Sequence, residues 1–264
     1  MESPLSELSK RYLTARIRRM DCIAAVLFII LSIYLYQPSI APSKATLLLY
    51  GLNLFLAALG TYFLSKRWVN NWTPSVFAGA IYGFGPFALS FKTFHPVAGL
   101  SFAIVPWLLL PAVYWHKQKA ANASRFSTRA LFTLLPFIGI VLLFWIPSQE
   151  WIGPFFLMPQ QLALTIEDFT NLILPLHKAG GLIVFGLYHC SLIFALMGIF
   201  ICIKLQRVAL LIPIAIGLIL AFLDPVLQVT PIVWAAFPIV FLSVLCGLGF
   251  QAFLCAGKAD KNGF

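Results

Sequence analysis

The stretch PIVWAAFPIVFLSVLCGLGFQAFLC, residues 231–255, runs for 25 residues without a charged side chain. A helix needs about 20 predominantly apolar residues to cross the hydrocarbon core of a bilayer. The stretch is therefore long enough and apolar enough to predict a transmembrane helix. It is the last of several such segments in the chain.

The composition extends this prediction to the whole chain. Of the 264 residues, 61% are hydrophobic and only 10% are charged, whereas about 25% of the residues of a soluble domain are charged. So few charges cannot cover the surface of a protein of this size in water. We therefore predict an all-α, polytopic integral membrane bundle of eight helices, at residues 20–37, 46–65, 74–91, 97–115, 130–147, 181–203, 208–223 and 231–255.

The basic residues orient the predicted bundle. With the N-terminus on the inner side, fifteen of the eighteen Lys and Arg residues fall in inner segments, and only Lys44, Lys92 and Lys178 fall in outer segments. Because cytoplasmic loops of membrane proteins are enriched in basic residues, this division predicts that both termini lie inside. It also accounts for the net charge of +10 without a nucleic-acid partner. The expected partners of these charges are anionic lipid headgroups.

The predicted bundle occupies residues 20–256 and leaves smaller segments around it. Residues 1–19 are expected to form a basic amphipathic helix at the membrane interface, residues 148–180 an outer interfacial segment, and residues 257–264 a short cytoplasmic tail. Asp21 is expected to form an ion pair with its basic neighbours in the first segment. Five basic residues would anchor that segment among the headgroups: Lys10, Arg11, Arg16, Arg18 and Arg19.

Few side chains are suited to catalysis. Carboxylates on the outer side, Glu167, Asp168 and Asp224, are the candidates for a general base or for holding a divalent cation. Glu167 and Asp168 also suit the first turn of a water-facing surface helix, where the helix dipole favours acids. We favour this structural role for the pair.

A second group of candidates on the outer side is cationic. Lys92, His95, His177 and Lys178 would bind a lipid phosphate if the two segments that carry them meet. No metal site or cofactor is predicted. The five cysteines lie in or beside apolar segments without a CxxC pair, and they are expected to pack as small apolar residues.

The central region resembles a known family. Residues 47–116 contain LLLYGLNLFLAALGTYFLSKRW, AGAIYGFGPFALS and HPVAGLSFAIVPWLLLPAVYW. This order of segments is similar to the central region of bacterial YfhO-like membrane proteins, in the GT-C superfamily of polyprenyl-phosphate-sugar glycosyltransferases. The resemblance implies a GT-C-like helical body in a bacterial inner membrane. The features that carry it are Tyr62, Lys66–Arg67, Ile81–Phe87, His95–Pro96 and Val105–Leu110.

One departure from that family bears on function. GT-C enzymes carry a catalytic acidic residue in a long first outer loop, whereas the corresponding loop here is QPSIAPSK, residues 37–44, without Asp or Glu. A general base cannot be replaced by Ser or Lys without a change of mechanism. The first hypothesis is therefore a non-catalytic accessory or scaffold subunit of a larger membrane complex. The alternative is a lipid-linked glycosyltransferase with its site on the outer face, and the third hypothesis is a transporter or lipid flippase.

Overall fold

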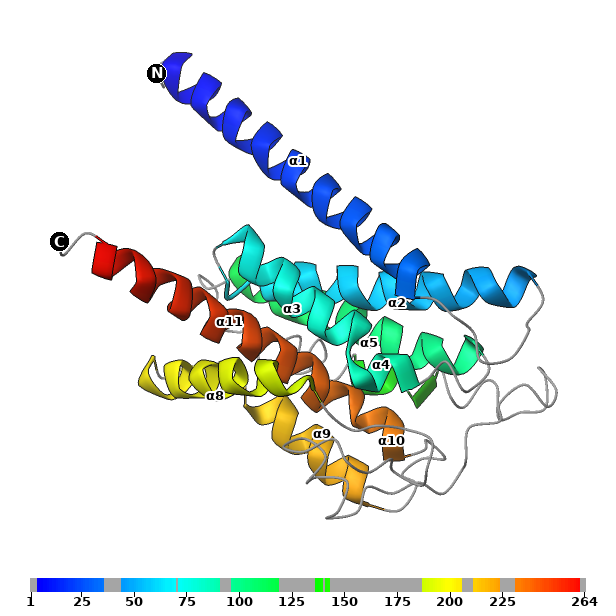
Figure 1. Ribbon diagram of the computed structural model, residues 1–264. Helices are drawn as coiled ribbons and strands as arrows, with labels where there is room; N and C mark the ends of the chain where they lie inside the picture. Colours follow the sequence, from blue (N-terminus) through cyan, green and yellow to red (C-terminus); the bar gives the residue numbers. More distant parts are fainter. Residues whose placement is uncertain are drawn as a thin grey trace.

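A computed structural model of the chain describes residues 4–35, 44–69, 71–90, 96–118, 136–139, 141–142, 187–205, 211–223 and 231–261. Within these ranges every regular element is a helix, which confirms the all-α class. Figure 1 shows the helices gathered into one bundle, with the first helix leaning away from the others and both chain ends toward the same side of the view.

The helices follow most of the predicted spans. The second, fourth and seventh spans correspond to α2, α5 and α9, and the fifth is described only at residues 136–139 and 141–142, which are helical. The outer segment 148–180 lies outside the described residues. The helices are α1 Pro4–Leu35, α2 Lys44–Ser65, α3 Trp72–Phe84, α4 Pro86–Ser90, α5 Pro96–Gln118, α8 His189–Lys204, α9 Ile212–Phe222, α10 Pro231–Trp234 and α11 Ala236–Lys261.

Prolines divide two of the predicted spans. In the third span, α3 ends at Phe84. Gly85, the residue before Pro86, has an extended backbone with φ −71° and ψ 168°, because a helical conformation is disfavoured for a residue that precedes proline. The eighth is divided at Ala235, where Pro238 has no N–H to bond the carbonyl of Trp234. In the sixth span, the helix that the structure describes begins at His189, and Leu187 and Tyr188 before it are not helical; residues 181–186 lie outside the described ranges.

Two helices are long and apolar enough to cross a membrane. The stretches that meet this condition, by length and composition alone, are Leu48–Ser65 of α2 and Ala236–Ala256 of α11. Gly99–Pro111, Ser191–Lys204 and Ile212–Phe222 are shorter apolar stretches among the described residues. The number of eight spans therefore stays a prediction.

The start of α11 forms the centre of the bundle. Figure 1 shows α11 running through the middle of the molecule, and it contacts α3, α8 and α9. From Val233 to Leu248 every side chain is buried, although the segment has no single apolar face. A helix that is apolar all round is stable only away from water, in a protein core or in a membrane, and the first half of α11 is enclosed by its neighbouring helices.

Glycines allow the helices around this centre to approach closely. A side chain at Gly198 of α8 would clash with the carbonyl of Leu245, and a side chain at Gly249 of α11 would clash with the carbonyl of Phe194. Likewise, a Cβ atom at Gly83 of α3 would lie 2.7 Å from the backbone nitrogen of Ala58 on α2. Small residues at such crossings bring two backbones into contact, which is the usual way that helices associate in membranes.

The first helix contacts the bundle along one side only. Ala24 and Phe28 are fully buried against α2 and α3, whereas other large apolar side chains in the part of α1 whose side chains are described, including Ile30 and Ile33, are exposed. The helix continues without a break through residues 19 and 20, where the interfacial helix was expected to end and the first span to begin. The basic N-terminal segment is thus a direct extension of α1 in Figure 1.

Candidate functional site

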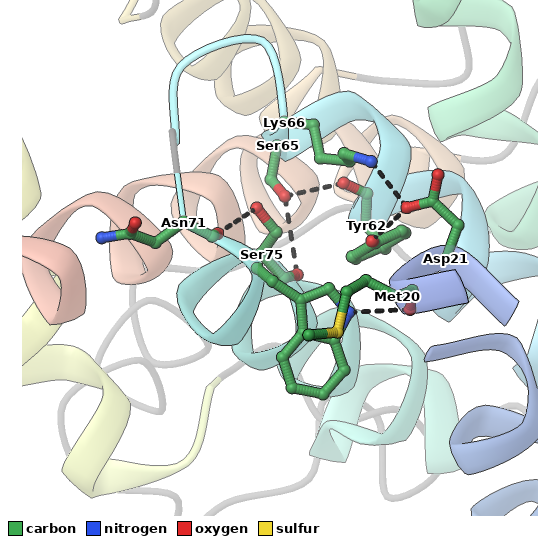
Figure 2. Close-up of polar contacts among 8 residues, drawn as sticks. Met20, Asp21, Tyr62, Ser65, Lys66, Asn71 and Ser75 are labelled. Atoms are coloured by element: carbon green, nitrogen blue, oxygen red, sulfur yellow. Dashed lines mark hydrogen bonds and ion pairs between the residues drawn. The ribbon is translucent and has the colours of Figure 1, made fainter. Parts of the chain in front are cut away.

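A carboxylate on the first helix is held by two donors from the second. Lys66 Nζ lies 2.6 Å from Asp21 Oδ1, and the Tyr62 hydroxyl donates a hydrogen bond of 2.5 Å to the same oxygen (Figure 2). The side chains of Lys66 and Asp21 are 28% and 26% exposed, so the ion pair is only partly open to solvent. Between Glu7 and Glu150 the sequence contains no other acidic residue.

The geometry of α2 explains why two donors reach one oxygen. Tyr62 and Lys66 are four residues apart, so they lie one above the other on the same side of the helix. The helical pattern extends to Lys66, whose backbone N–H donates to the carbonyl of Tyr62 at 3.2 Å. The Lys66 ammonium also lies 5.2 Å from the centre of the Tyr62 ring, where the face of an aromatic ring attracts a cation.

A third helix joins at the same point. The indole N–H of Trp72, in the first turn of α3, donates to the carbonyl of Met20 at 2.9 Å (Figure 2). Ser65 Oγ lies 2.8 Å from the carbonyl of Tyr62 and 3.5 Å from that of Ser75, which connects α2 to α3. We call the set Met20, Asp21, Tyr62, Ser65, Lys66, Trp72 and Ser75 the clamp, because it fastens α1, α2 and α3 together at one end.

The chemistry of the clamp is that of a cross-link between helices. Both donors to Asp21 meet a single oxygen of an isolated carboxylate, so the described site has no second acid for general acid–base catalysis. Among the described residues no group of three or more His, Cys, Asp or Glu side chains is placed to hold a metal ion. An exposed ion pair contributes about 0–1 kcal/mol, and the Tyr62 hydrogen bond to the same carboxylate oxygen adds to the contribution of this one.

The clamp corrects one expectation from the sequence. Asp21 was expected to pair with its sequence neighbours, Arg18 or Arg19, but its described partner is Lys66, 45 residues further along the chain. Sequence reasoning missed this pair and Tyr62. A signal was present, because the predicted topology puts the start of the first span and the end of the second on the same side of the membrane.

Most predicted site residues lie outside the described part of the chain. This holds for the acidic candidates and for the phosphate-binding candidates: Glu167, Asp168, Asp224, Lys92, His95, His177 and Lys178. Of the predicted anchors, Lys10, Arg11, Arg16 and Arg18 belong to α1 by their backbone, and Arg19 is exposed. The catalytic and outer lipid-phosphate roles therefore stay predictions.

Two other polar side chains donate hydrogen bonds to backbone carbonyls inside the bundle. The Tyr82 hydroxyl donates to the carbonyl of Phe102 at 2.6 Å, and the Tyr188 hydroxyl donates to the carbonyl of Phe84 at 2.7 Å. The first carbonyl lacks its helical donor because Pro106 stands four residues later, and the second belongs to the last residue of α3. A free backbone carbonyl is costly in an apolar medium, so these bonds hold the bundle together.

The cysteines divide by position. Cys202 and Cys246 are buried, and the Cys246 thiol lies 3.1 Å from the carbonyl of Ser191, whereas Cys22 and Cys255 are exposed. Packing inside the bundle, as expected from the sequence, thus describes two of these four residues. The Cys190 side chain lies outside the described part of the structure.

No protein-family model, curated protein or solved structure matches the chain. The similarity to YfhO-like proteins therefore stays a hypothesis from the sequence.

Proposed function

We propose that the chain is a multi-pass membrane protein that acts as a non-catalytic accessory or scaffold subunit of a larger membrane complex. The observation that carries the proposal is the apolar outer surface of the described helices. Large aliphatic and aromatic side chains are exposed on three of them: Ile30 and Ile33 on α1, Ile193 and Phe200 on α8, and Ile216 and Ile219 on α9. Exposed apolar surface of this extent is unfavourable in water and marks contact with lipid or with other proteins.

The use of the polar side chains supports a scaffold rather than an enzyme. Asp21 and Lys66 join two helices through their charges, and Tyr82, Trp107 and Tyr188 each donate to a backbone carbonyl of another helix. These are the polar groups that an intramembrane catalytic site would draw on. In the described bundle they stabilise helix packing.

The orientation of the proposed protein follows from its charges. The fifteen-to-three division of basic residues favours inner termini, and the ends of α1 and α11 that point the same way in Figure 1 agree with an even number of crossings between them. A bacterial inner membrane is the location that we propose, on the basis of the sequence resemblance.

The test is gentle extraction of the tagged protein from its native membrane. Native-gel sizing and mass spectrometry of co-migrating proteins follow, with an unrelated tagged membrane protein extracted in parallel as the control. We expect stoichiometric partners that persist through washing and are missing from the control. A lone species near 29.4 kDa would contradict the subunit proposal, and a polyprenyl lipid bound to it would favour the lipid-linked glycosyltransferase.

A further inference from the structure

We propose, on the basis of the membrane location proposed above, that Arg19, Lys66 and Arg67 bind the phosphate of an anionic phospholipid headgroup beside the clamp. Arg19 lies on α1, and Lys66 and Arg67 lie in the turn that follows α2, the two elements that the clamp fastens together. Arg19 precedes Met20, whose carbonyl accepts the Trp72 hydrogen bond, and Lys66 pairs with Asp21. Arg67 follows Lys66 directly.

The backbone that carries Arg67 is fixed. After α2 ends at Ser65, the N–H of Arg67 donates to the carbonyl of Leu64 at 3.2 Å. The N–H groups of Trp68 and Val69 both donate to the carbonyl of Ser65 at 2.9 Å. Arg67 is also partly buried, as is Lys66. Lys66 and Arg67 therefore lie on an ordered turn. This order lowers the conformational entropy that is lost when their side chains bind an anion.

The charges of this corner do not balance. Arg19, Lys66 and Arg67 supply three positive charges, and Asp21 neutralises one of them, which leaves a net charge of +2 beside the clamp. Basic residues near a membrane surface attract anionic lipid by about 1 kcal/mol each. The guanidinium groups of Arg19 and Arg67 also match the geometry of phosphate oxygens, because each presents parallel N–H donors.

The surroundings favour a lipid over a free phosphate ion. Trp72 lies in the clamp and Trp68 in the turn beside Arg67, and both are partly buried. Tryptophan is typical of the headgroup level of membranes. From the same corner the exposed apolar side chains Ile23 and Val26 lead along α1. A phospholipid would therefore meet cations at its phosphate and an apolar helix face along its acyl chain.

The test is a competition between lipids, read by native mass spectrometry. The full chain is purified from membranes in mild detergent and mixed with equal amounts of phosphatidylglycerol and phosphatidylcholine. Wild type is compared with the double variant Arg19→Gln, Arg67→Gln and with Lys204→Gln as the control. Lys204 is an exposed lysine at the end of α8, so the control removes one positive charge away from the clamp.

We expect wild type and the control to retain phosphatidylglycerol in preference to phosphatidylcholine. The double variant should lose about 25-fold of that preference, since about 1 kcal/mol for each of the two charges corresponds to about fivefold in affinity per charge. An unchanged preference in the double variant, or an equal loss in the control, would overturn the proposal. Inorganic phosphate alone, if it displaced phosphatidylglycerol at millimolar concentration, would assign the corner to free phosphate and overturn the lipid site.

Two further readouts separate the possible failures. The double variant should elute from size exclusion as wild type does, and if it does not, the salt dependence of wild-type binding decides, because an electrostatic site weakens as salt rises. Binding of phosphatidylglycerol that salt leaves unchanged would then overturn the site. Recovery of the wild-type chain in the membrane fraction tests the membrane location on its own, independently of any lipid preference.

Discussion

The Tyr82 hydroxyl lies 2.6 Å from the carbonyl oxygen of Phe102, and this carbonyl is the one that Pro106 leaves without a helical donor. Tyr82 is fully buried, and its ring packs against the ring of Phe102 with the centroids 6.2 Å apart. Tyr82 of α3 thus donates the hydrogen bond that Pro106 cannot donate to the Phe102 carbonyl in α5.

Replacing Tyr82 by Phe should destabilise the protein by about 1–3 kcal/mol, because a buried carbonyl would lose its donor while the ring packing is kept. The measurement is the thermal midpoint of the purified protein in detergent. Tyr34→Phe is the control, since Tyr34 is 78% exposed on α1. Equal midpoints for the two variants would contradict the role assigned to the Tyr82 hydroxyl.

Asp21 and Lys66 should be energetically coupled. The single variants Asp21→Asn and Lys66→Met each leave the other residue without its charge partner, whereas the double variant removes both charges. We therefore expect the double variant to lose about 0.5–2 kcal/mol less stability than the sum of the single losses. Chemical or thermal unfolding of the four proteins gives this difference. Strict additivity would show that the ion pair contributes nothing to the clamp.

Gly249→Ala should be destabilising by about 1–3 kcal/mol, because the added methyl group would force α11 away from the backbone of Phe194 on α8. Gly51→Ala is the matched control on α2. A Cβ atom at Gly51 has nothing within 4 Å, and alanine is the better helix former by about 1 kcal/mol. The two substitutions should therefore shift the thermal midpoint in opposite directions. A shift of the same sign and size would show that the two helices do not need this close approach.

The proposed topology can be tested with cysteines introduced at Arg19 and Lys44. Lys44 is the first residue of α2, whereas Arg19 lies two residues before Asp21, which pairs with Lys66 just beyond the other end of α2. In intact cells a membrane-impermeant maleimide should label Lys44→Cys and spare Arg19→Cys until the membrane is opened. Labelling of both, or the reverse pattern, would contradict the orientation. The native cysteines are replaced by Ala in both proteins so that only the introduced thiol reacts.

Much of the helix content followed from composition and apolar run length. The run at 46–65 became α2, and the run at 97–115 became α5, because an apolar segment of about 20 residues has few ways to satisfy its backbone except as a helix. The positions at which the helices are interrupted were harder to predict from the sequence. Pro86 and Pro238 divide their spans, whereas Pro106 and Pro111 lie inside α5 without ending it. Whether a proline ends a helix depends on what satisfies the freed carbonyl, and that donor comes from elsewhere in the chain.

The candidate site was also predicted only in part from the sequence. The sequence singled out Asp21 as a charge at the edge of a span, but it proposed neighbouring arginines as partners. Only the packing of α1 on α2 brought Lys66 and Tyr62 to the carboxylate, from 45 and 41 residues away.

By itself, the sequence determined the helical class, the scarcity of charge and the one-sided distribution of basic residues, because these depend on composition and local order alone. The tertiary structure decided which polar side chain meets which partner, as for Asp21 with Lys66 and Tyr82 with the carbonyl of Phe102. Such pairings require helices that are far apart in the sequence to pack closely, which the glycines at the helix crossings permit. No local sequence pattern shows which helices will pack together.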